Sequence, residues 1–136
     1  MAKTPHSKIW VFAEHREGKL AEVGLELLGK SFELAELTGQ KVALVLMGHQ
    51  LNRVYEEILS FGADEILVAE HPLLKSYCSQ TYVKVLENAI RKHQPEIFLL
   101  GATAMGTDLG ARLAARLRTG LSARCIDLRI SSEKKL

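Results

Sequence analysis

Cysteine, long apolar runs and concentrated charge are all scarce in this chain. The two cysteines, Cys78 and Cys125, lack metal or redox spacing and do not indicate a disulfide framework, so we expect a reducing compartment. A net charge of +2 without a dense Lys/Arg run argues against a nucleic-acid partner. No apolar run approaches the roughly 20 residues that cross a bilayer, and the opening MAKTPHSK lacks the apolar core of a secretory signal. We therefore expect a cytoplasmic protein without membrane insertion.

Catalytic and metal-binding patterns are also missing. The histidines at His15, His49, His71 and His93 fall on different loops or helix ends, and no two have metal-ligand spacing on one helix. His15 and His49 directly follow predicted strands, where we expect solvated side chains. No G-x-S-x-G or comparable nucleophile turn is present. The sequence predicts neither catalytic residues nor a metal site.

What the sequence does contain is a regular alternation of apolar strands and amphipathic helices. Short apolar runs predict strands at residues 8–13, 41–47, 65–69, 97–100 and 125–130. Helical periodicity separates them, over residues 20–37 and 51–61, through Tyr82–Ile90, and after Gly106. Strands joined by single helices imply right-handed crossovers and a parallel sheet. We expect one three-layer, doubly wound α/β domain over residues 1–136, with its core over about 8–130.

Two loops of this arrangement could bind a ligand. Residues 14–18 follow the first strand and residues 101–106 follow the fourth, so both loops flank one crevice if the strand order reverses between these strands. Thr103 and Thr107 would supply hydroxyls there, and Gly106 would allow close backbone approach at a helix N-terminus. Tight packing of the helix on the sheet requires the same small residues without any ligand. The spacing also matches neither G-x-G-x-x-G nor G-x-x-x-x-G-K-[ST].

Arginines are concentrated late in the sequence. This excess could meet a phosphate or an acidic partner, whereas a solvated helix face explains it at least as well. Asp108 and Arg112 stand at i, i+4 and are expected to pair on the helix surface. The arginines of this group are Arg112, Arg116, Arg118, Arg124 and Arg129.

Three stretches in the same order resemble the N-terminal domain of the electron transfer flavoprotein alpha subunit. They are IWVFAEHREGKLAEVGLELL, then VALVLMGH with FGADEILVAEHP, and finally LLGATAMGTDLGARLAARLRTGLSARC. The last resembles the family signature G-x-T-x-x-G-x-x-L-x-x-R-x-A-A-x-L-x-x-G-L. Together they cover nearly all of residues 8–130. The resemblance implies a Rossmann-like fold of the adenine nucleotide alpha hydrolase type.

The same resemblance implies a function. The chain would pair with a beta subunit and carry electrons from dehydrogenases through FAD, as an electron carrier component and not a self-contained enzyme. In the family a C-terminal domain holds most of the FAD, and its fingerprint is absent here, so we expect no flavin to bind this chain alone. Carried over by position, the signature offers Thr103, Gly106 and Arg112 as cofactor contacts. Arg124 departs from the acidic residue that the family often has after G-L-x-A.

A stand-alone nucleotide-binding domain resembling universal stress proteins is the alternative. That family carries a phosphate loop of the form G-x-x-G-x9-G-[ST]. Here Gly110 and Gly120 have the nine-residue gap, but Leu121 follows in place of Ser or Thr. Residues 111–113 are also predicted to lie inside a helix. The flavoprotein interpretation therefore fits the residues better.

Overall fold

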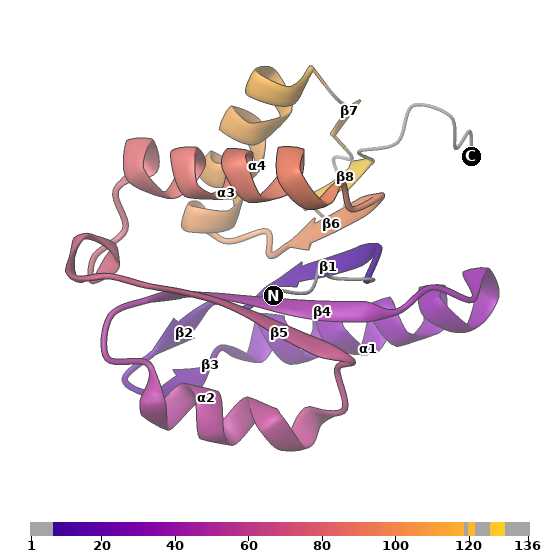
Figure 1. The fold of residues 1–136 in the computed structure, drawn as a ribbon, viewed down its shortest axis with the longest axis horizontal. Helices are drawn as coiled ribbons and strands as arrows, with labels where there is room; N and C mark the ends of the chain where they lie inside the picture. The colour runs from indigo at the N-terminus through magenta and orange to yellow at the C-terminus, as the bar shows by residue number, and fades with distance from the viewer. Residues whose placement is uncertain (1–6, 119, 122–125, 130–136) are drawn as a thin grey trace.

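A six-stranded sheet lies between two layers of helices in the computed structural model, which describes residues 7–118, 120–121 and 126–129 (Figure 1). In spatial order the strands are β5 (Glu65–Glu70), β4 (Val42–Gly48), β1 (Ile9–Phe12), β6 (Ile97–Leu100), β8 (Ile126–Arg129) and β7 (Gly120–Leu121). The helices are α1 (Glu22–Thr38), α2 (Asn52–Ile58), α3 (Ser79–His93) and α4 (Ala104–Leu117), with 3-10 turns η1 (Leu59–Phe61) and η2 (Pro72–Leu74).

The parallel part of the sheet confirms the predicted fold class. Strands β5, β4, β1 and β6 are parallel neighbours, and β1 pairs with β4 on one side and β6 on the other. In register, Ile9 lies opposite Val42 of β4 and Ile97 of β6. The strand order therefore reverses between β1 and β6, as the position of a ligand crevice requires.

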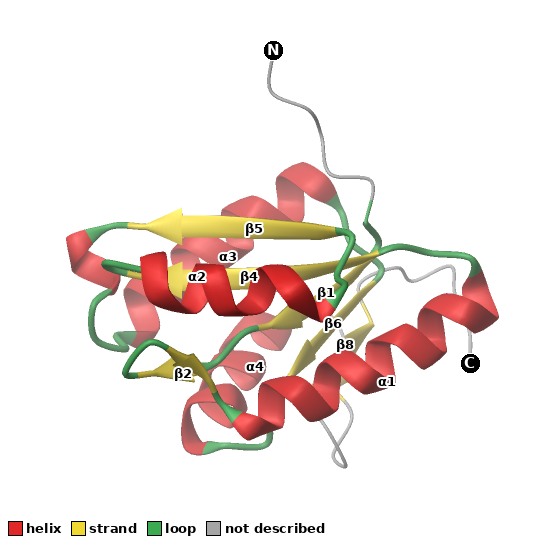
Figure 2. Ribbon diagram, turned by 90° about the horizontal axis from the view of Figure 1, so that it is seen from below, coloured by secondary structure: helices red, strands yellow, loops and turns green. Residues whose placement is uncertain are grey.

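Alternating side chains of the central strands fill two separate cores. In β1, Trp10 and Phe12 face the core under α3 and α4, while Ile9 and Val11 face the core under α1 and α2. All four side chains are nearly or fully buried, which explains the continuous apolar run in the sequence because helices cover both faces. Figure 2 shows α1 and α2 crossing one face of the sheet.

Small residues let α1 lie against the sheet, as expected. Its buried residues are Gly24, Leu27, Leu28 and Ser31. The Ser31 hydroxyl donates to the carbonyl of Leu28 at 2.6 Å, so this buried polar group is satisfied within the helix. Among the described residues, no helix combines the length and apolarity that crossing a membrane would take.

The end of the sheet differs from the all-parallel expectation. After α4 the chain runs through β7, which pairs antiparallel with β8, and β8 in turn pairs antiparallel with β6. Gly120 lies opposite Arg129, which itself lies opposite Ile97. Strand β7 thus takes the direction predicted for the fifth strand, and β8 reverses it. The ends of the predicted strand at 125–130 lie outside the described residues.

The loop after β1 also holds more structure than expected. Strands β2 (His15–Arg16) and β3 (Lys19–Leu20) form a small antiparallel hairpin. Glu17 and Gly18 connect them with φ values of 53° and 78°, a pair of left-handed residues that suits a two-residue hairpin turn. Helix α1 consequently begins at Glu22, two residues later than predicted.

Candidate functional site

The two loops predicted to flank one crevice do meet at the carboxyl edge of β1 and β6. Glu14 follows β1, and Thr103 follows β6 as the N-cap of α4. The Thr103 hydroxyl donates to Glu14 Oε1 at 2.5 Å, joining residues 89 positions apart. The topological switch point therefore brings together two polar side chains that the sequence places far apart.

Thr103 also satisfies the first turn of α4. Its Oγ1 accepts a hydrogen bond from the backbone N–H of Gly106 at 3.0 Å, and its carbonyl accepts from Thr107 N at 2.8 Å. Helix N-termini leave such N–H groups free to bind an anion unless a side chain caps them. One donor that a ligand at this helix N-terminus could use is thus already bonded within the chain.

Gly106 lies directly against the backbone of the turn before it. A Cβ on Gly106 would stand 1.9 Å from the carbonyl oxygen of Gly101, well inside any permitted contact. A Cβ on Gly101 would in turn meet Cγ2 of Val23 in α1 at 2.8 Å. Both glycines are needed for close packing in the structure as it stands, which supports the packing alternative at this turn.

The carboxylate of Glu14 accepts a hydrogen bond from the residue that caps α4. It is one hydroxyl away from the positive end of α4, where negative charge is stabilised. The backbone carbonyl of Glu14 accepts from Ala21 N at 2.8 Å, which holds the start of α1 to the same loop. Chemically, this edge joins β1, β6, α1 and α4 through internal hydrogen bonds.

The β2–β3 hairpin makes polar contacts that the sequence did not predict. A ring nitrogen of His15, Nε2, lies 2.8 Å from the carbonyl oxygen of Met47 at the end of β4. The backbone N–H of Leu20 donates to Glu57 of α2 at 2.8 Å. His15 is half-buried, so the expectation of a solvated side chain was wrong for this residue. The reason is the hairpin, which turns the loop back over the sheet edge.

Arg112 lies apart from the other two predicted contacts. Its Nε donates to Asp108 Oδ1 at 3.0 Å, which confirms the predicted i, i+4 pair. Asp108 Oδ2 accepts from the Tyr77 hydroxyl at 2.6 Å, a partner that the sequence analysis missed. The bonds from Tyr77 and then Arg112 lower the pKa of Asp108. Burial, followed by the bond to Asp108, raises the pKa of Tyr77.

The phosphate-loop alternative meets a structural obstacle in α4. Gly110, where that signature would begin its long gap, is a buried residue in the middle of the helix. Backbone N–H groups in a helix interior are bonded to carbonyls one turn earlier and are not free to surround a phosphate. Over the described residues 104–118, the chain therefore does not present the loop that the alternative requires.

Comparisons with known proteins find one family domain and several similar proteins. The Electron transfer flavoprotein domain matches residues 9–136. The chain is 44% identical over 135 residues to the electron transfer flavoprotein subunit alpha of Clostridium acetobutylicum, covering 99% of this chain and 40% of that protein. It is 44% identical over 126 residues to the acryloyl-CoA reductase electron transfer subunit beta of Anaerotignum propionicum, covering 93% and 34%. Protein FixB of Rhizobium meliloti is 35% identical, with 96% and 38% covered.

The chain spans about 40% or less of the length of these relatives. Such partial coverage fits the N-terminal domain that the sequence resembles. The α/β fold, the order of the three resembling stretches and the match over residues 9–136 all fit the same domain. This chain belongs to the electron transfer flavoprotein domain family.

Proposed function

We propose that this chain serves as the N-terminal assembly domain of an electron transfer flavoprotein alpha subunit. In this role it pairs with a beta subunit and leaves the FAD to be held by another domain, while dehydrogenases deliver electrons to the complex in the cytoplasm. Residues 1–136 act as one domain, because both cores are built on one sheet. Support for the assignment comes from its relatives, one of which is named as an alpha subunit.

The observation that carries this proposal is that polar groups at the crevice between β1 and β6 bond to one another. In open α/β sheets, ligands bind outside the carboxyl ends of the strands at the switch point. Here Glu14, Thr103, Gly101 and Gly106 occupy that position through contacts among themselves. A domain whose polar groups at the usual ligand position bond to one another suits a scaffold better than a carrier of its own cofactor.

Size-exclusion chromatography with a beta subunit and titration with FAD test the two halves of the proposal separately. We expect the chain to co-elute with the beta subunit at micromolar concentrations and to leave FAD fluorescence unchanged when titrated alone. Separate elution would contradict the role in assembly. Quenching of FAD by the isolated chain would contradict the claim that the flavin is held elsewhere. A titration with AMP applies the same test to the nucleotide-binding alternative.

Thr103, Gly106 and Arg112 are the proposed contacts from this chain to a flavin bound in the assembled complex. Arg112 is the one whose side chain is more than half exposed, at 54%, so its variant is the most informative. We expect Arg112→Gln to shift the absorption spectrum or the reduction potential of the flavin in the complex. An unchanged spectrum and potential would remove Arg112 from the proposed contacts.

A further inference from the structure

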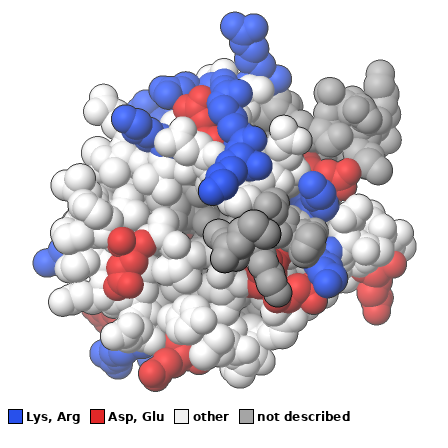
Figure 3. Space-filling view, viewed as in Figure 1, with Lys and Arg blue, Asp and Glu red and all other residues white. Residues whose placement is uncertain are grey.

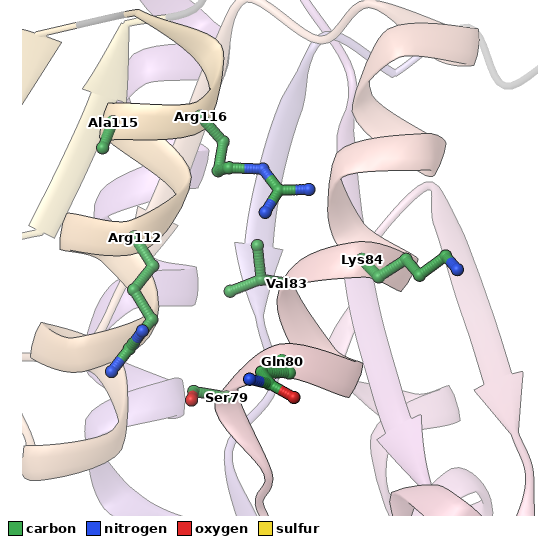
Figure 4. A pocket seen from close by; sticks show the side chains of 7 residues that line it. All are labelled: Ser79, Gln80, Val83, Lys84, Arg112, Ala115 and Arg116. Carbon is green, nitrogen blue, oxygen red and sulfur yellow. The ribbon is translucent and has the colours of Figure 1, made fainter.

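An open groove runs between α3 and α4 on the outer side of their layer. Its volume is about 460 Å³, and Figure 4 shows its lining. Val83 of α3, which is buried, forms part of an apolar floor. Arg112 and Arg116 extend from α4, and Ser79 and Gln80 lie at the end of the groove nearest the start of α3. The groove combines apolar surface with guanidinium groups and neutral hydrogen-bonding groups.

The guanidinium of Arg112 is oriented by a carboxylate on the same helix. Its Nε is bonded to Asp108, whose other oxygen is bonded by the Tyr77 hydroxyl. Within the described part of the chain this is its only hydrogen bond, so both terminal nitrogens of the guanidinium remain available. Two parallel N–H groups on a fixed arginine match the two oxygens of a carboxylate. Pre-organisation of this kind lowers the cost of binding.

Arg116 belongs to a second cluster with surplus positive charge. Glu87 of α3 accepts from Arg116 at 2.8 Å and from Arg91 at 3.0 Å, so one carboxylate serves two guanidinium groups. The hydrogen bond from Arg91, with that from Arg116, lowers the pKa of Glu87 and keeps it ionised. Both arginine side chains are 59% exposed. The cluster carries a net positive charge next to the groove.

The whole α3–α4 layer carries a net positive charge. It contains two acidic residues, Glu87 and Asp108, and both are already bonded to arginines. In Figure 3, blue side chains gather at the top of the view, where Figure 1 places these helices. A surface of one sign attracts and orients a partner of the other. The basic residues of the layer are Lys84, Arg91, Lys92, Arg112, Arg116 and Arg118.

The shape and chemistry of the groove favour a protein segment over a nucleotide or nucleic acid. It lies between two helices on the outside of the layer and not at the carboxyl edge, where small ligands of this fold bind. Among the described residues no aromatic side chain lines the groove, so bases would find no surface there on which to stack. An amphipathic helix placed between two helices buries apolar residues on the floor and presents its charges to the rim.

We propose that the α3–α4 groove docks an acidic, amphipathic helical segment of a partner protein. A carboxylate of that segment is held bidentately by Arg112, and a second carboxylate meets Arg116. Lys84, which extends away from Arg116 in Figure 4, adds positive charge beside the groove. Apolar side chains between the carboxylates rest on Val83 and Ala115. The proposal goes beyond assembly with a beta subunit, since it concerns the chemistry of one surface and not the identity of the complex. It assigns Arg112 to a protein carboxylate in place of the flavin, so a changed flavin spectrum in the Arg112→Gln complex would contradict it.

Fluorescence anisotropy with a labelled peptide tests this surface on the whole chain. The probe is a helix of Glu, Leu and Ala about 18 residues long, and its Gln-for-Glu counterpart is the control peptide. The groove variant carries Lys84→Gln, Arg112→Gln and Arg116→Gln. The matched control carries Arg16→Gln, Lys19→Gln and Arg53→Gln, which remove the same charge from exposed positions on the hairpin and α2. Thermal melts confirm that both variants fold.

We expect the acidic peptide to bind the wild-type chain and the Gln peptide not to bind. The groove variant should weaken binding about tenfold or more, because two charge-assisted contacts are lost. The matched control should bind within about twofold of wild type, and Tyr77→Phe should weaken binding to a smaller extent by releasing Asp108. Raising the salt above about 0.1 M should weaken binding as the Debye length falls below 10 Å.

Three results of the binding experiment would also overturn the proposal. The first is no binding of the acidic peptide at low salt. The second is an equal loss in the groove variant and in the matched control, which would show a response to net charge alone. The third is groove-dependent binding of inorganic pyrophosphate or a single-stranded oligonucleotide that is tighter than binding of the peptide, which would assign the groove to phosphate. None of these results depends on whether the chain pairs with a beta subunit.

Discussion

The two helical layers share one sheet but have different interiors. Under α3 and α4 the core holds the four buried aromatic residues among the described residues, Trp10, Phe12, Tyr82 and Phe98. Under α1 and α2 the buried members are aliphatic throughout. Because neighbouring residues on a strand face opposite sides, the sheet builds both kinds of core from the same short runs.

The outer surfaces of the two helical layers differ as well, because their net charges have opposite signs. The α3–α4 layer carries six basic and two acidic residues through Arg118. The α1–α2 layer reverses these numbers, with Lys30 and Arg53 as its basic residues and six glutamates. The net charge of +2 therefore conceals a strongly polarised molecule. Overall charge excludes few partners when the charge is divided between faces. The glutamates are Glu22, Glu26, Glu33, Glu36, Glu56 and Glu57.

Truncating adjacent residues of β6 should give the largest effects and separate the two cores. Phe98 and Leu99 are both fully buried, one on each side of the sheet. Phe98 also makes edge contacts with Trp10 and Phe12, at centroid distances of 5.9 and 6.4 Å. We expect Phe98→Ala to lower the free energy of unfolding by about 4 kcal/mol and Leu99→Ala by about 3 kcal/mol. Urea denaturation measures both, and a larger loss at Leu99 would contradict the ranking.

Replacing one glycine by alanine in each helical layer should give the next largest effect on stability. In Gly106→Ala the new Cβ meets the backbone oxygen of Gly101 at 1.9 Å, so α4 must move, at a cost of about 3 kcal/mol. In Gly24→Ala of α1 the neighbour is the Leu20 side chain at 3.0 Å, which can rotate away. The cost there should stay below about 1 kcal/mol, because alanine also favours the helix. Similar losses in thermal unfolding would show that the two layers are equally constrained.

The sequence predicted this layered fold well because its signals are local. All five predicted strands lie within two residues of strands in the structure. The reversal of order between β1 and β6 was only a condition of the predicted crevice, and the structure meets it. The strand at β8 was predicted, but its antiparallel direction was not, because the same alternation, extended past α4, predicts another parallel strand. Nothing in the local pattern around Gly120 distinguishes a short hairpin from a simple break.

The candidate site was predicted in part. Thr103 and Gly106 could be placed at one helix N-terminus because they are three residues apart. The partner Glu14 was predicted only as part of a nearby loop, since its bond to Thr103 spans 89 positions. Tyr77 could not be linked to Asp108 because the loop between β5 and α3 carries no periodic signal. Long-range side-chain contacts of this kind depend on the assembled fold.

A glycine with free space around it offers a smaller effect of the opposite sign. Gly29 lies within α1, and a Cβ there would meet nothing within 4 Å. Gly29→Ala should therefore raise the free energy of unfolding by about 0.5–1 kcal/mol, because alanine loses less conformational entropy in a helix. Thermal unfolding beside Gly24→Ala and Gly106→Ala would show a gain, a small loss and a large loss. Destabilisation by Gly29→Ala would mean that α1 packs more closely than the structure describes.

The smallest expected effect concerns the acid response of the basic layer. Arg91 and Arg116 hold the pKa of Glu87 below its usual value, so its ionised form is favoured in the folded protein. The stability it contributes is present above the ordinary glutamate pKa of about 4.3 and is lost as the pH falls through the lowered folded value. Glu87→Gln should thus melt below the wild type near neutral pH, and the difference should shrink on acidification.

The Glu56→Gln variant on α2 makes the same charge change in the acidic layer and supplies the comparison. At neutral pH, removing Glu87 leaves Arg91 and Arg116 facing each other without their shared carboxylate, whereas removing Glu56 thins a surplus of like charges. The two substitutions should therefore shift the melting temperature in opposite directions at low salt, and both shifts should fade as salt screens the exposed charges. Shifts of equal sign would mean that the charges of each layer act singly, and the polarity of the molecule would then contribute nothing to its stability.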